Sequence, residues 1–101
     1  MTDPEKLQAL NDAITEIDLT LTEKVSGYRE VYIYDRAKCI IAVEIEGDWK
    51  HDHLYSKHLM KELGYVYLRE NCAESDSDYY FATHFYLVGD VKLKKLLEAM
   101  D

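Results

Sequence analysis

The sequence DWKHDHLYSKHLMKELG, residues 48–64, contains the most clearly bounded helix in the chain. Asp48 can accept hydrogen bonds from the free N–H groups of a first turn, and Gly64 can adopt the left-handed conformation that closes a last turn. Strand-like sequence flanks this segment on both sides. We therefore predict a helix over residues 49–63 at the centre of an α+β domain.

The predicted helix has one buried side and one solvated side. At about 100° per residue its apolar side chains cluster on one face, with Asp52 among them near the N-terminus. The lysines fall on the opposite face and are expected to lie in water. The inward group is Trp49, Tyr55, Ser56, Leu59, Met60 and Leu63, and the outward group is Lys50, Lys57 and Lys61.

An N-terminal helix is predicted over residues 4–25. Asp3 before Pro4 offers an N-cap followed by proline at the first helical position. Apolar residues then recur at spacings of three and four, which draws one apolar seam. The segment 17–22 also alternates strictly and contains β-branched threonines, so a strand there remains the alternative.

From Tyr28 the hydrophobic period changes to two, which is the period of a strand. Two hairpins are predicted, over residues 29–46 and 65–88, and the second has a polar loop at 70–78. A final helix is predicted over residues 91–100. The element order is then α-ββ-α-ββ-α, with a four-stranded, mostly antiparallel sheet and the helices packed on one face of it.

Alternation along the strands predicts two different sheet faces, because successive strand side chains point to opposite sides. One face is aliphatic and phenylalanine-rich and is predicted to be the core. The other gathers six of the nine tyrosines and is either a recognition surface or covered by a terminal helix. The predicted core face is Val31, Ile33, Ile41, Val43, Ile45, Val66, Leu68, Phe81, Phe85 and Leu87, and the predicted tyrosine face is Tyr32, Tyr34, Glu44, Tyr65, Tyr67, Tyr80, His84 and Tyr86.

The chain is acidic, with a formal net charge of -8, and its 101 residues fit a single domain. The polar N-terminus and the absence of a long apolar run argue against a signal peptide, a membrane span and membrane contact, so a cytoplasmic protein is expected. Cys39 and Cys72 lie far apart outside any C-x-x-C motif and are expected to be buried thiols.

No catalytic motif is recognisable, since the sequence lacks a G-x-S-x-G elbow, a glycine-rich phosphate loop and an H-E-x-x-H helix. His51 and His58 lie two helical turns apart and His53 points away from both, so the three do not form a ligand set. A weak metal site at His51 or His53 stays open, as does a role for His84 as a base. No cofactor is predicted.

Direct binding of nucleic acid is not expected. Aromatic side chains on an open sheet can stack bases, but such surfaces also carry lysine and arginine. Here the segment 70–78 has four acidic residues and no basic one. These charges repel phosphates and favour a protein partner with a basic surface.

We therefore expect a non-enzymatic, acidic protein-binding module. The best match in character is a small inhibitor that occupies the basic nucleic-acid-binding surface of a partner enzyme, as phage anti-CRISPR or anti-restriction proteins do, although no motif identifies such a family. A homo-oligomeric structural or regulatory protein, for instance a homodimer, is the alternative, and a metal-dependent enzyme is a minor one. The expected partner-binding residues are Tyr32, Tyr34, Glu44, Tyr67, Glu70, Glu74, Asp76, Asp78, Tyr80, His84 and Tyr86.

Overall fold

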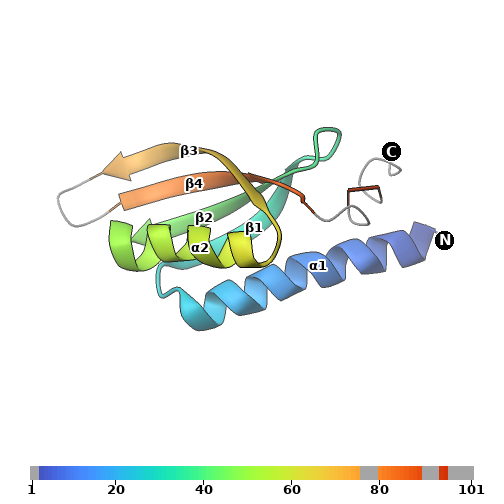
Figure 1. The fold of residues 1–101 in the computed structure, drawn as a ribbon, viewed down its shortest axis with the longest axis horizontal. Coiled ribbons are helices and arrows are strands. Elements are labelled where there is room, and N and C mark those ends of the chain that lie inside the picture. The colour runs from blue at the N-terminus through green and yellow to red at the C-terminus, as the bar shows by residue number, and fades with distance from the viewer. Residues whose placement is uncertain (1–2, 76–79, 90–93, 96–101) are drawn as a thin grey trace.

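The computed structural model describes residues 3–75, 80–89 and 94–95 of the chain. A four-stranded antiparallel sheet of order β1-β2-β4-β3 carries both helices on one side, and no helix among these residues covers the other side (Figure 1). The elements in chain order are α1 (Asp3–Lys24), β1 (Tyr28–Asp35), β2 (Ile40–Gly47), the π-helical turn η1 (Trp49–Leu54), α2 (Tyr55–Glu62), β3 (Val66–Ser75) and β4 (Tyr80–Leu87).

The predicted α+β fold and its antiparallel sheet are confirmed, whereas the predicted element order is matched only in part. The helix predicted over residues 91–100 lies outside the described residues except for two lysines. The polar loop predicted at 70–78 is wrong in its first part, because β3 stays paired with β4 as far as Ser75. Residues 76–79 lie outside the described residues.

Residues 17–22, for which the sequence left a strand open, are helical. Burial explains the outcome, because Ile17 and Leu21 enter the core together with Leu10, at spacings that only a helix brings to one side. A strand would place Leu19 on the same side as Ile17 and Leu21, but Leu19 is 63% exposed. Neither α1 nor any other helix in the described part of the chain is long and apolar enough to cross a membrane.

The predicted central helix forms the connection that crosses from β2 over β4 to β3. Since β2 and β3 are each antiparallel to β4, they run parallel to each other, and a parallel pair needs a crossover connection. Both predicted boundaries hold. The Asp48 carboxylate accepts from the His51 N–H at 2.9 Å, and Gly64 follows α2 with a φ of 96°.

The π-helical turn changes which side chains face the sheet. The His53 N–H donates to the Asp48 carbonyl, five residues back, at 3.2 Å, so this turn is wider than an α-helical one. His53 is therefore fully buried, whereas Trp49 and Tyr55, predicted to point inward, are 38% and 40% exposed. Lys57, predicted to be solvated, has its ammonium group 4.6 Å from the centroid of the Trp49 ring.

Asp52 joins two stretches of the chain at one buried carboxylate. Its Oδ1 accepts from the Ser26 hydroxyl at 2.9 Å and from the Gly27 N–H at 3.1 Å, and its Oδ2 accepts from the Asp48 N–H at 2.8 Å. A Cβ on Gly47, which has a φ of 155°, would lie 2.1 Å from Asp52 Oδ2, so this position requires glycine. Asp52 thus holds the end of α1 to the start of the crossover.

The core lies between the sheet and the helices, with β2 at its centre. Ile41, Val43 and Ile45 of β2 are at most 1% exposed, as the sequence predicts. Cys39 is buried as expected, but Cys72 is exposed, and neither forms a disulfide. The other buried members of this core are Leu10, Ile17, Leu21, Val25, Leu59, Met60, Tyr65, Tyr86 and Val88.

Candidate functional site

The predicted tyrosine face is divided between the two sides of the sheet, so the prediction of a single face is wrong. We call the side away from the helices the open face and the other the helix side. On the open face lie Glu30, Tyr32, Tyr34, Ala42, Glu44 and Phe85. On the helix side lie Tyr65, Tyr67, Glu70, Tyr80, His84 and Tyr86.

The register between β2 and β4 turns the second hairpin over relative to the prediction. Val43, a core residue, pairs with His84, so His84 and its alternate neighbours face the helices. Phe85 pairs with Ala42 and faces away from them. In this hairpin tyrosine and histidine alternate with phenylalanine and leucine, and tyrosine is apolar enough to lie on either side. The alternation alone therefore did not determine the orientation.

The edge strand β3 also departs from the prediction. A register shift at Leu68 interrupts its alternation, and Val66 and Leu68, both predicted to be core residues, are 52% and 44% exposed. Of the predicted acidic patch, Glu74 is paired with Phe81 of β4, after a second register shift. Asp76 and Asp78 lie outside the described residues.

The open face carries two exposed tyrosines beside one buried phenylalanine ring. Tyr34 is 53% exposed and packs edge-on against Phe85, with the ring centroids 4.7 Å apart. The guanidinium of Arg69 lies 4.1 Å from the Phe85 centroid. Phe85 is therefore buried although no described helix lies above it, whereas Tyr32 and Tyr34 are accessible to a partner.

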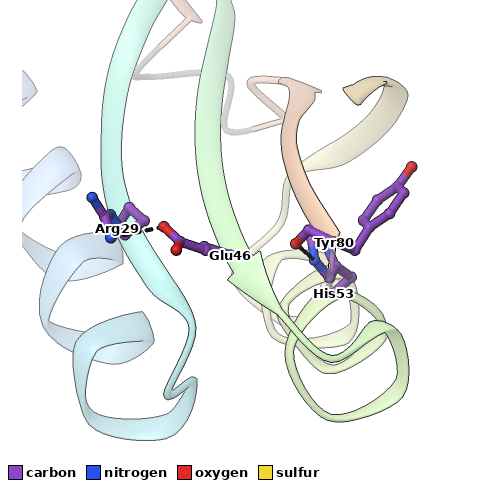
Figure 2. Close-up of polar contacts among 4 residues, drawn as sticks. All are labelled: Arg29, Glu46, His53 and Tyr80. Atoms are coloured by element: carbon purple, nitrogen blue, oxygen red, sulfur yellow. Dashed lines mark hydrogen bonds and ion pairs between the residues drawn. The ribbon is translucent and has the colours of Figure 1, made fainter. Parts of the chain in front are cut away.

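Glu30 and Glu44 are paired across β1 and β2 on the open face. Partial burial raises the pKa of Glu44, and the Glu30 carboxyl raises it further, while Tyr32 and Arg29 act in the opposite direction. Like charges at directly opposed strand positions repel each other. Arg29 offsets this repulsion only in part, since its Nη1 forms an ion pair with Glu46 Oε2 at 2.7 Å (Figure 2).

On the helix side, His53 and His84 bond to each other in the protein interior. His53 Nδ1 lies 2.8 Å from His84 Nε2. Figure 2 shows the second contact, in which His53 Nε2 donates to the Tyr80 carbonyl at 2.8 Å. Because a carbonyl only accepts, neutral His53 has its proton on Nε2 and accepts from His84 Nε2–H. His84 Nδ1 is then a bare acceptor without a partner among the described residues. Burial lowers the pKa of His84 to about 3, and the charges of His53 and Lys57 contribute.

The histidine pair holds η1 against β4 and is closed to any substrate, since both side chains are fully buried. Trp49 stacks on His53 with centroids 5.4 Å apart, and Tyr80 meets Trp49 edge-on at 5.1 Å. The Tyr80 hydroxyl donates to Glu70 Oε2 at 2.7 Å. Glu70, Tyr80 and His84, which the sequence assigned to partner binding, are thus engaged in contacts within the second hairpin and with η1.

A half-open cleft of about 380 Å³ lies between α2 and the start of β3, and we call it the α2–β3 cleft. The sequence did not predict it, because its residues come from the lysine face of the helix and from strand positions whose orientation was assigned in reverse. The available signal was a pair of lysines one helical turn apart, followed closely by a tyrosine-rich strand. The cleft is lined by Lys57, His58, Lys61, Tyr65, Val66, Tyr67 and Tyr86.

Within the described ranges, no group of three or more His, Cys, Asp and Glu side chains is placed to hold a metal ion. The weak metal site considered for His51 or His53 therefore has no set of three ligands among the described residues. His51 is exposed, and His58 Nε2 lies 3.0 Å from Glu62 Oε1 on the same helix.

No protein-family model matches the chain, and no curated protein or solved structure is significantly similar to it. Its function is therefore inferred from its own residues and their geometry.

Proposed function

We propose that the protein is a non-enzymatic binding module that presents the open face of its sheet to a basic surface of a partner protein. The observation that carries this proposal is the Glu30–Glu44 pair beside two exposed tyrosines, on the sheet face that no described helix covers. An enzyme with a nucleic-acid-binding groove is a partner of this kind. The module would inhibit such an enzyme by occupying the groove.

The charges of the open face favour a basic partner. An arginine or lysine placed between Glu30 and Glu44 would relieve their repulsion and lower the raised pKa of Glu44. The formal net charge of -8 adds attraction at longer range. Grooves that bind phosphate backbones are lined with lysine and arginine and so complement both features.

The tyrosines of the open face supply contact area. Tyr34 is held edge-on by Phe85, so it loses little conformational freedom when a partner covers it. Burial raises the pKa of Tyr32, and the Glu44 charge adds to this. Tyr32 is also hydrogen-bonded to the Glu44 carboxyl, which holds its ring beside the acidic pair.

Charge also distinguishes a basic partner from a second copy of the chain. Self-association through the open face would bring Glu30 and Glu44 of one copy toward the same two residues of the other, and such like-charge contacts are unfavourable. We expect sedimentation of the purified protein at low salt to give a monomer. A dimer that dissociates in a Tyr34→Ala variant would instead assign the open face to self-association.

Affinity capture with two charge-matched variants tests the proposal. The face variant carries Glu30→Gln and Glu44→Gln, and the control variant carries Glu16→Gln and Glu23→Gln at exposed positions of α1. For a partner captured by the wild type, we expect the face variant to bind at least about tenfold more weakly and the control variant to bind within about twofold of the wild type.

The same purified partner is then titrated in the presence of duplex DNA at constant ionic strength. Competition by the duplex supports occupation of a nucleic-acid-binding groove, and simultaneous binding contradicts it. Equal weakening in both variants would mean that net charge alone drives capture, and no weakening in the face variant would remove the open face from the interaction.

A further inference from the structure

Two lysines of α2 lie at the α2–β3 cleft, and no carboxylate among the described residues pairs with them. Lys57 and Lys61 are one helical turn apart, both line the cleft, and neither forms an ion pair with any residue in the described part of the chain. The Lys57 ammonium instead lies 4.3 Å from the centroid of Tyr67 and 4.6 Å from that of Trp49. An acidic protein thus keeps two cations beside an aromatic cleft.

The aromatic floor of the cleft is uncharged. Tyr67 and Tyr86 meet edge-on with centroids 5.6 Å apart, and burial raises the pKa of both phenols, with Glu70 contributing at Tyr67. The Tyr86 hydroxyl is buried and makes no hydrogen bond to any described residue. The Ser56 hydroxyl donates to the His53 carbonyl at 2.8 Å and only moderates the raised pKa of the Tyr86 phenol. A rotation of the exposed Tyr67 ring would let a ligand oxygen accept from that hydroxyl.

We propose that the α2–β3 cleft binds a small aromatic carboxylate, with its ring on the tyrosine floor and its carboxylate between the two lysine ammonium groups. The cleft volume of about 380 Å³ lies within the range of small-molecule sites. Tyrosine rings favour edge-to-face contacts with another ring, and the ammonium groups offer charge-assisted hydrogen bonds to a carboxylate. The third basic residue, His58, already has the Glu62 carboxylate beside it.

This site is independent of the proposed partner interface. It lies on the helix side, carries positive charge, and shares no residue with the open face. A variant that no longer binds the aromatic carboxylate can therefore still be tested for binding to the partner protein, and the reverse also holds.

The test is a titration of the isotope-labelled protein with 2-naphthoate and with its neutral analogue 2-naphthamide, followed by backbone amide NMR. We expect 2-naphthoate to bind saturably with a Kd on the order of 1 mM or below, as its size allows. The largest shifts are expected at Lys57, Val66 and Tyr67. The neutral analogue should bind at least about tenfold more weakly, because its amide oxygen forms weaker hydrogen bonds with the ammonium groups than a charged carboxylate does.

Two variants that each lose two lysine charges distinguish binding in the cleft from a general effect of net charge. The cleft variant carries Lys57→Met and Lys61→Met, which keep the apolar stems, and the control carries Lys24→Met and Lys50→Met at exposed positions. We expect the cleft variant to lose about tenfold in affinity for 2-naphthoate and to retain its affinity for 2-naphthamide, while the control stays within about twofold of the wild type.

Three outcomes would overturn the proposal: equal affinity for the two probes, shifts centred outside the cleft, or the same loss of 2-naphthoate binding in both lysine variants. A fall in 2-naphthoate affinity with added salt, without a change for 2-naphthamide, would support it.

Discussion

The two hairpins have similar alternating sequences, yet only the first has the orientation that alternation predicts. In β1 and β2 the contrast is between aliphatic residues and charged or tyrosine residues, and the aliphatic set faces the helices. In β3 and β4 both sets contain aromatic rings. There, packing partners decide the orientation: His84 bonds to His53, while Phe85 is covered by Tyr34 and Arg69. Weak hydrophobic contrast leaves orientation to specific contacts.

The largest expected effect is the difference in stability loss when one tyrosine of each hairpin is replaced by alanine. Tyr86→Ala should destabilise the protein by about 3–5 kcal/mol, because it removes a fully buried ring from the core. Tyr34→Ala should cost less than about 1 kcal/mol, since more than half of that side chain is exposed. Urea unfolding at neutral pH measures both, and similar losses would mean that the two hairpins do not differ in this way.

The next expected effect is a loss of stability in acid that arises from the second hairpin. Folded His84 has a pKa of about 3 against an ordinary value of 6.5, so between these values the unfolded chain binds a proton that the folded protein does not. Stability is therefore full above 6.5 and falls as the pH decreases, by about 1.4 kcal/mol per pH unit for one proton.

His84→Gln removes this titration while its amide can still donate to His53 Nδ1. Urea midpoints measured at several pH values should then depend less steeply on pH than those of the wild type. His51→Gln, which replaces an exposed histidine by the same residue, is the matched control. An unaltered slope in His84→Gln would show that other groups cause the acid sensitivity.

A smaller effect is expected from the buried phenol of the second hairpin. Tyr86→Phe removes a hydroxyl that makes no hydrogen bond to the described residues while keeping the ring, so we expect stability to rise by up to about 1 kcal/mol. Thermal unfolding of the two proteins side by side measures the change. A clear loss of stability would reveal a hydrogen bond at this hydroxyl.

The smallest expected effect belongs to the first hairpin. The raised pKa of Glu44 means that the folded state holds this proton more tightly than the unfolded state, so stability falls as the pH rises past the ordinary value of 4.5. Glu44→Gln should therefore stabilise the protein at neutral pH by roughly 0.5 kcal/mol, a small effect because Glu30 is exposed and solvent screens the repulsion between the two carboxylates. Glu16→Gln, on α1, should have no measurable effect in the same unfolding assay.

Sequence reasoning succeeded where one residue type has one structural role. Asp48 and Gly64 mark the two ends of the crossover helix as predicted, and residues 17–22, which belong to the apolar seam, are helical. It failed where a local change of geometry redirects many side chains. The π-helical turn buried His53, and nothing in a fixed helical period signals that turn.

The candidate site was predicted only in part for the same reason. Tyr32, Tyr34 and Glu44 lie together because their strands alternate clearly. Tyr67 and Tyr86 line a cleft on the opposite side instead, together with lysines that a helical wheel assigns to solvent. The cleft depends on the register between strands of different hairpins, which is a long-range property.

The Asp52 carboxylate has a consequence for how the chain can be divided. Two of its three donors, Ser26 and Gly27, belong to the link between α1 and the sheet. In a fragment that starts at Tyr28, only the Asp48 amide of these three donors would remain, and the loss of hydrogen bonds to a buried polar group is costly. The first helix is therefore an integral part of the domain, and an exchange of this helix between two copies would have to rebuild the same joint in each.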